Sequence, residues 1–197
     1  MKNLVLLTVS LFISATMFAQ KVVKVQGDLS VLKSVKEINI EYDYSNMGVG
    51  KFKTEEEYVK SKVSEYNEKE PGRGDNWKES WVNSRQRVYH PKFEELFNKY
   101  AGVTASQNNT SAKYTLIVKT VFTEPGFNIG VAKKPASINY EYILVETDTR
   151  NVVAKFKHEK VPGAQAFGYD YDTSTRISEA YAKAGKMFGQ FVAKALK

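Results

Sequence analysis

The stretch PASINYEYILVETDTRNVVAKFKHEK (Pro135–Lys160) decides the fold of this 197-residue chain. Its first half alternates polar and apolar residues, and four large side chains share one face: Ile138, Tyr140, Tyr142 and Leu144. Such alternation with a period of two is typical of a half-buried β-strand. Residues 148–151 have the composition of a hairpin turn, and a second alternating run extends from Val152 to Lys160. The sequence therefore predicts two antiparallel strands joined by that turn.

Three earlier segments also have the pattern of strands. Lys113–Thr123 is apolar on both faces, which predicts a strand in the centre of the sheet. Val35–Ser45 alternates, with its isoleucines and tyrosines on one face, and Val22–Gly27 is a shorter candidate that ends at a glycine. The chain between Val35–Ser45 and the central strand is long enough for a crossover, which leaves a parallel pairing of these two strands open.

The intervening sequence predicts helices with defined ends. Thr54 and Glu57 have the spacing of a capping box, so a helix begins there, and Pro71-Gly72 ends it. Pro91 lies inside a later helical pattern, where it predicts a kink or a break. Gly102 follows the last apolar residue of that pattern and is expected to terminate the helix.

The tripeptide Arg73-Gly74-Asp75 occurs between two of these helices and has the sequence of an integrin-binding motif. We interpret it as the boundary between two helices, because Asp75 or Asn76 is suited to cap the second helix. Trp77 and Trp81 follow at helical spacing and form the inward stripe of that helix.

The C-terminal segment predicts a long amphipathic helix. Its large apolar residues recur on one stripe, and a second stripe of small residues that includes Gly185 and Gly189 lies beside it. Because each glycine costs about 1 kcal/mol relative to alanine in a helix, we expect a close backbone approach to the sheet, to another helix or to another chain. The predicted fold class is α+β, with an antiparallel or mixed sheet of about four to five strands packed by three to four helices.

The N-terminus has the pattern of a Sec-type signal peptide. Lys2 precedes the short apolar run Leu4–Ile13, and Ala19 is the best residue before a cleavage site. We therefore expect residues 1–19 to be a signal peptide, residues 20–197 to form a single domain, and the protein to be periplasmic or secreted in a bacterium. The chain has no cysteine, so it lacks the residue that would carry a lipid anchor.

The charge of the chain excludes few partners. The formal net charge is +7, and Lys2 is the only charged residue of the predicted leader. Lysine and glutamate are interleaved along most of the chain, and no basic run contains the aromatic residues typical of nucleic-acid binding. We expect no nucleic-acid partner, whereas an anionic polysaccharide or lipid headgroups remain partners that the charge allows.

No motif indicates an enzyme, a metal site or a cofactor. His90 and His158 are the two histidines, and neither has a further histidine or a cysteine at ligand spacing. We interpret both as partly exposed structural residues. No G-x-S-x-G elbow or phosphate-binding glycine loop is present.

Two loops are the best candidates for contact with a ligand or partner. The segment Gly126–Pro135 is predicted to be a long loop between strands that exposes Phe127, Lys133 and Lys134. The segment Gly168–Asp172 contains Tyr169 and Tyr171 beside acidic residues, as in many sugar sites, although its Asp172 also suits a helix cap.

Three stretches resemble uncharacterised secreted or periplasmic proteins of Gram-negative bacteria: GDLSVLKSVKEINIEYDYS, YVKSKVSEYNEKEPGRGDNWKESW and RISEAYAKAGKMFGQFVAKALK. More loosely, the predicted order of elements resembles the small α+β domains of the curli-secretion channel and of the TolB N-terminal class. That resemblance implies an envelope role and no catalytic residues, and this chain departs from it by lacking the lipid-bearing cysteine.

The sequence therefore favours an exported, non-enzymatic envelope protein that acts in assembly or binding through contacts with another protein or with itself. The alternative is a carbohydrate- or anion-binding module that uses the tyrosines and lysines of the two loops. A hydrolase is the third hypothesis.

Overall fold

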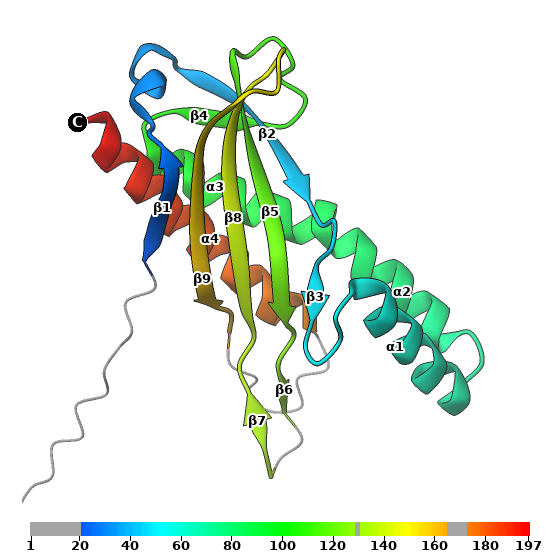
Figure 1. Ribbon diagram of the computed structural model, residues 1–197. Coiled ribbons are helices and arrows are strands. Elements are labelled where there is room, and N and C mark those ends of the chain that lie inside the picture. Colours follow the sequence, from blue (N-terminus) through cyan, green and yellow to red (C-terminus); the bar gives the residue numbers. More distant parts are fainter. Residues whose placement is uncertain (1–20, 129–130, 165–172) are drawn as a thin grey trace, which may run out of the picture.

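The computed structural model of the chain describes residues 21–128, 131–164 and 173–197 (Figure 1). Within them lies one mixed sheet in the order β1-β9-β8-β5-β2-β4, to which β3 adds by pairing with β5. The long strands are β2 (Glu37–Asp43), β5 (Tyr114–Glu124), β8 (Ser137–Glu146) and β9 (Val152–Pro162). The short ones are β1 (Val22–Gly27), β3 (Gly48–Val49) and β4 (Thr104–Ser106).

The pairing confirms the strand arrangement expected from the sequence. β8 and β9 form the predicted antiparallel hairpin, with Tyr142 opposite Phe156. β5 lies inside the sheet between β8 and β2, and it pairs with β2 in parallel, with Leu116 opposite Ile40. The alternating apolar residues of these strands are the buried ones, because one face of the sheet carries the core.

The predicted strand number was too low. Within the described residues the main sheet has seven strands, and a separate ribbon pairs β6 (Phe127–Asn128) with β7 (Lys133–Lys134). β3, β6 and β7 have two residues each and β4 has three. An alternation of polar and apolar residues cannot be recognised in runs this short. Their strand conformation depends instead on pairing with a partner strand.

Two helices cover one face of the sheet, and two others project from its edge (Figure 1). α3 (His90–Ala101) and α4 (Thr173–Leu196) lie behind the sheet, while α1 (Glu55–Lys69) and α2 (Arg73–Ser84) form a helical hairpin beside it. A 3-10 turn, η1 (Ser30–Ser34), follows β1. The expected α+β class, mixed sheet and long C-terminal helix are therefore confirmed.

Aromatic side chains fill the space between the sheet and the helices. The ring of Tyr142 on β8 stacks on Phe188 of α4 with 3.8 Å between centroids, and Phe93 of α3 lies 6.1 Å from the same tyrosine. Tyr140 and Tyr142 are both fully buried. Aromatic pairs in such offset or edge geometries stabilise a core beyond the area that they bury.

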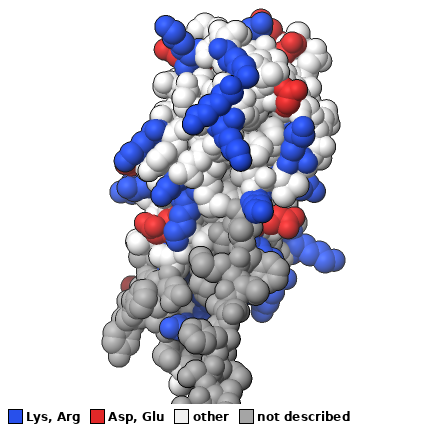
Figure 2. All heavy atoms as spheres, turned by 90° about the vertical axis from the view of Figure 1, so that its left-hand side faces the viewer, with Lys and Arg blue, Asp and Glu red and all other residues white. Residues whose placement is uncertain are grey.

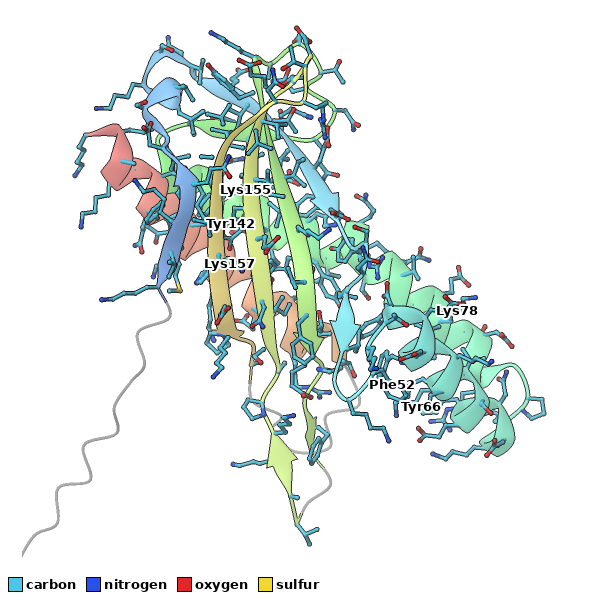
Figure 3. All side chains as sticks on the ribbon, in the orientation of Figure 1. Phe52, Tyr66, Lys78, Tyr142, Lys155 and Lys157 are labelled. Carbon is cyan, nitrogen blue, oxygen red and sulfur yellow. The ribbon has the colours of Figure 1, made fainter. Side chains whose placement is uncertain are left out.

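Other aromatic contacts join the projecting hairpin to the sheet. Tyr58 of α1 contacts Phe52 at 5.8 Å and Trp81 of α2 at 5.2 Å between ring centroids. Figure 3 shows Phe52 where the hairpin meets the sheet and Tyr66 farther along α1. The hairpin is thus held to the rest of the molecule at its base.

The prediction that Asp75 or Asn76 caps the second helix was wrong. α2 begins at Arg73 after Gly72, which has a φ of 83°. The backbone amide of Gly74 donates instead to the side-chain Oδ1 of Asn67 in α1 at 2.7 Å. The Asp75 carboxylate accepts a hydrogen bond from the side-chain amide of Asn67 at 3.2 Å. The Asn67 side chain of the preceding helix therefore accepts the hydrogen bond that a capping side chain next to α2 would otherwise accept.

Pro91 does not break the helix. A π-helical turn, η2 (Arg85–Tyr89), immediately precedes α3, and the amide of His90 donates to the carbonyl of Arg85. Since proline cannot donate and its ring would clash with the carbonyl one turn earlier, the wider turn is the local adjustment that lets the helix continue. Gly102 ends α3 with a φ of 76°, as expected.

Candidate functional site

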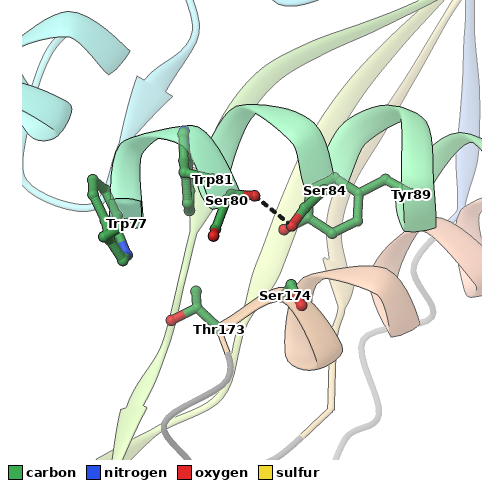
Figure 4. Close-up of a pocket in the computed structure, with 7 residues that line it drawn as sticks. All are labelled: Trp77, Ser80, Trp81, Ser84, Tyr89, Thr173 and Ser174. Atoms are coloured by element: carbon green, nitrogen blue, oxygen red, sulfur yellow. Dashed lines mark hydrogen bonds between the residues drawn. The ribbon is translucent and has the colours of Figure 1, made fainter. Parts of the chain in front are cut away.

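A cleft of about 170 Å³ lies between α2 and the start of α4 (Figure 4). It combines aromatic rings with hydroxyl groups, and we name it the Trp77 cleft; among the described residues its lining consists of Trp77, Ser80, Trp81, Ser84, Tyr89, Thr173 and Ser174. The first five come from α2 and η2, and the last two come from the first turn of α4. The cleft therefore depends on two segments that are far apart in the sequence.

The helical repeat sets the aromatic and polar groups of the cleft side by side. Trp77 and Trp81 are one turn apart, and their rings stack with centroids 5.7 Å apart and planes at 26°. Ser80 and Ser84 fall on the same face, since residues three, four and seven positions apart along a helix are neighbours. The Ser84 hydroxyl donates to the Ser80 carbonyl at 2.7 Å.

An ion pair holds Trp81 in place. Its indole Nε1 donates to the Glu55 carboxylate of α1, and the same carboxylate pairs with the Arg85 guanidinium. That guanidinium lies 3.9 Å from the centroid of the Tyr44 ring. Since both charged side chains are mostly buried, their contacts fix the indole orientation before any ligand binds.

Behind the cleft lies a chain of buried hydroxyl groups. Thr120 Oγ1 is 2.9 Å from the Tyr181 hydroxyl, which donates to the Tyr44 hydroxyl at 3.1 Å, and Tyr44 is 2.9 Å from His90 Nε2. A cavity of about 10 Å³, lined in part by Tyr44, Trp81 and Tyr181, has the size of one water molecule. This network stiffens the wall of the Trp77 cleft.

The two histidines are buried, so the prediction that they are partly exposed was wrong. His90 is 3% exposed and His158 is 0% exposed. His90 stacks on Tyr42 with 3.6 Å between centroids, and His158 Nδ1 is 3.0 Å from the Tyr142 hydroxyl. Burial lowers the pKa of each imidazole to about 4. Neither lines the Trp77 cleft.

The described residues contain no group of three or more histidine, cysteine, aspartate or glutamate side chains that could hold a metal ion. None of the helices in the described ranges has the length and apolarity needed to cross a membrane.

The structure brings some of the sequence-predicted contact residues together and leaves others undescribed. Phe127 lies opposite Lys134 in the β6–β7 ribbon, and Lys133 lies opposite Asn128, so this segment is a strand ribbon and not the loop that we predicted. Lys134 forms an ion pair with Glu124. Tyr169, Tyr171 and the proposed cap Asp172 lie outside the described residues.

The sequence predicted the tryptophans only as the inward stripe of a helix, and it did not lead us to expect the serines at the site. The signal was present, because Trp77, Ser80, Trp81 and Ser84 share one helix face by spacing alone. Thr173 and Ser174 carry no comparable signal, since only the folded structure places the start of α4 opposite α2.

Comparisons with known proteins do not assign the chain to a family. No family model matches it, and no curated protein matches it. Its fold is similar to that of a variant PelC dodecamer from Paraburkholderia phytofirmans, with a TM-score of 0.39 and 11% identity over 84% of this chain and 97% of that chain. A second PelC crystal form gives a TM-score of 0.38, with 9% identity over 84% and 96%. A homolog of the neuraminyllactose-binding hemagglutinin from Helicobacter pylori gives 0.35, with 13% identity over 81% and 86%. Similarities at this level identify neither the family nor the function.

Proposed function

We propose that this protein is an exported, non-enzymatic protein of the bacterial envelope that binds a saccharide in the Trp77 cleft. The observation that carries the proposal is the pair of stacked tryptophans beside the hydroxyl groups of Ser80, Ser84 and Thr173. A sugar ring offers a C–H face, which packs on aromatic carbon, and a rim of hydroxyls, which both donate and accept hydrogen bonds. The signal-peptide pattern supports the envelope location.

The chemistry of the lining supports binding and not hydrolysis. Glycoside hydrolysis commonly uses two carboxyl groups on either side of the scissile bond. The described lining residues of the Trp77 cleft include neither a carboxylate nor a histidine. Glu55, the carboxylate that contacts Trp81, is already paired with Arg85.

The volume of the cleft sets the size of the ligand. At about 170 Å³ it is smaller than the pockets of roughly 300–1,000 Å³ that enclose larger ligands. We therefore expect the cleft to hold one sugar ring, with the remainder of a longer saccharide outside it.

Intrinsic fluorescence provides a direct test, because Trp77 and Trp81 are the two tryptophans of the chain and both line the cleft. Titration with glucose, galactose, mannose and N-acetylglucosamine oligosaccharides should change the emission for at least one sugar. Ser80→Ala should weaken that binding about two- to tenfold, the value of one hydrogen bond, and Trp77→Ala should weaken it at least about tenfold.

Val82→Ala is the matched control, since Val82 is on α2, is 45% exposed and lines a different groove with Val59. It should leave the affinity unchanged. Circular dichroism establishes that each variant is folded. Absence of any saccharide response, or a folded Trp77→Ala variant with unchanged affinity, would refute the proposal.

One observation favours a second function, which is contact with another envelope protein or with a second copy through the β6–β7 ribbon. Phe127 is 42% exposed and Val131 is 96% exposed, and the ribbon extends beyond the end of the main sheet (Figure 1). Exposed apolar groups of this kind mark interaction sites when they lie together. Sedimentation velocity should then show an oligomer for the native protein and a monomer for Phe127→Glu, whereas a monomeric native protein would exclude self-association.

A further inference from the structure

The positive charge of the chain is concentrated along one edge of the sheet. Residues 21–36 and 152–160 contain seven lysines, whereas their acidic residues are Asp28 and Glu159. The two segments are neighbours in space, because β1 pairs antiparallel with β9. The C-terminal end of α4 lies beside β1 (Figure 1). Figure 2 shows this flank with many more basic than acidic side chains. We name it the lysine edge, formed by Lys24, Lys33, Lys155, Lys157, Lys160 and Lys194.

Acidic side chains of the protein neutralise little of this charge. Within the described residues, Lys157 comes within 3.9 Å of Glu141, and the other five lysines form no ion pair within 4.0 Å. Two other basic residues are paired: Lys119 of β5 with Asp43 at 2.7 Å, and Arg150 in the turn between β8 and β9 with Glu41 at 2.7 Å. The lysine edge therefore keeps a positive potential that attracts anions.

The lysines of the lysine edge lie on both faces of the sheet. Lys157 is opposite Val23 and Lys155 is opposite Gln26, on the sheet face that carries no helix, where Figure 3 shows both lysines along β9. Lys24 is opposite Phe156, whose ring packs on Phe191 of α4. A flat membrane surface would meet one of these sides, whereas a flexible polyanion can pass around the edge and contact both.

Protection of the sheet edge explains part of this charge. Edge strands commonly carry a lysine or a bulge that discourages pairing with other chains, and β1 has both Lys24 and a bulge between Lys24 and Gln26. Lys155 and Lys157 do not fit this role, because β9 is an internal strand between β1 and β8. Edge protection therefore does not account for their charge, which is available for a ligand, since Lys157 is exposed and Lys155 is half-buried.

We propose that the lysine edge binds an acidic polysaccharide, a sugar polymer that bears carboxylate or sulfate groups. This inference rests on the proposed saccharide function and specifies the ligand class, with the Trp77 cleft holding one ring and the lysine edge contacting charged groups elsewhere on the polymer. Five of the six lysines are exposed to solvent, and Lys155 is half-buried. Binding through them therefore weakens with salt, since exposed charges are screened over about 10 Å at 0.1 M ionic strength.

The test is binding of polygalacturonate to the purified protein, with neutral dextran and phosphatidylglycerol vesicles as comparison probes. Polygalacturonate should bind, and its affinity should fall at least about tenfold between low and high salt. The double variant Lys24→Glu/Lys155→Glu should lose at least about tenfold in affinity. Lys60→Glu/Lys78→Glu, the same charge change at two lysines that line the groove between α1 and α2, should bind as the native protein does.

The outcomes separate the two proposals. If the lysine edge proposal is wrong, Lys24→Glu/Lys155→Glu binds polygalacturonate as tightly as the native protein, whatever the effect of Trp77→Ala. If only the cleft proposal is wrong, Trp77→Ala keeps the native affinity while the lysine variant loses it. Tighter binding to the vesicles than to polygalacturonate, or equal binding to dextran, would overturn the assignment to an acidic polysaccharide.

Discussion

Gly185 of α4 lies against the backbone of Phe93 in α3, so closely that an added Cβ would come within 2.2 Å of the Phe93 carbonyl oxygen. Gly189, one turn later, has the same relation to Phe97, with 2.9 Å between the added Cβ and that carbonyl oxygen. The two glycines therefore let two helix backbones meet behind the sheet. Because α3 occupies this stripe, the alternative of a second chain docking on it is excluded.

Gly185→Ala should lower the free energy of unfolding by about 1–3 kcal/mol, since the new methyl group forces α4 away from α3. This loss should occur although alanine is the better helix former by about 1 kcal/mol. Gln190→Ala, at an exposed position of the same helix, is the control and should change stability little. Urea unfolding measures both, and a Gly185→Ala protein as stable as the native one would contradict the close contact.

The sequence allowed the long elements to be predicted because their burial pattern is local. Ile138, Tyr140 and Tyr142 alternate along one strand, and the same residues are buried. The glycines of α4 predicted a close approach, but not its partner, because Phe93 is 92 positions before Gly185 in the chain. β4 and the β6–β7 ribbon could not be predicted, since they are too short to show a pattern and depend on pairing.

The capping arrangement at the start of α2 gives a second prediction. Asn67→Ala removes the acceptor of the Gly74 amide and should cost about 1 kcal/mol, the usual value of a lost cap. Asp75→Ala removes only an exposed bond with Asn67 and should cost at most about 0.5 kcal/mol. Chemical denaturation of the two variants compares them directly, and a larger loss for Asp75→Ala would restore the sequence-based assignment of Asp75 as the cap.

The candidate sites depend on strand order and helix packing, which is why the sequence revealed them only in part. Trp77 and Ser80 share a helix face that can be read from their spacing. Thr173 joins them only because α4 begins opposite α2. Likewise, Lys24 and Lys155 lie at the same edge of the sheet only because β1 pairs with β9, and no local signal in either strand specifies that partner.

A pair of tyrosines with opposite hydrogen-bonding states gives a third prediction. The Tyr181 hydroxyl bonds Thr120 and Tyr44, so Tyr181→Phe leaves two buried hydroxyls without that partner and should cost about 1–3 kcal/mol. The Tyr140 hydroxyl is buried and has no partner within the described residues. Tyr140→Phe should therefore leave stability unchanged or raise it by about 1 kcal/mol. Thermal unfolding should give a melting temperature below that of the native protein for Tyr181→Phe and one at or above it for Tyr140→Phe; equal losses would contradict the assigned network.

The buried histidines predict how stability depends on pH. The pKa of His90 and that of His158 are lowered from 6.5 to about 4 by burial, with the nearby Arg85 charge adding to the effect at His90. Below about pH 6.5 the unfolded chain therefore takes up protons at both imidazoles while the folded chain does not. The free energy of unfolding should therefore have its full value above that pH. It should fall as the pH drops toward 4, by up to about 1.4 kcal/mol per pH unit for each histidine.

Urea unfolding between about pH 7 and about pH 5 measures this slope in a range above the titration of most carboxylates. His158→Gln removes one of the two titrating groups, so its slope should be about half that of the native protein, even where the substitution also lowers stability at neutral pH. A slope that His158→Gln leaves unchanged would show that His158 does not titrate below its ordinary range. Stability that rises as the pH falls through this range would contradict the burial of both imidazoles.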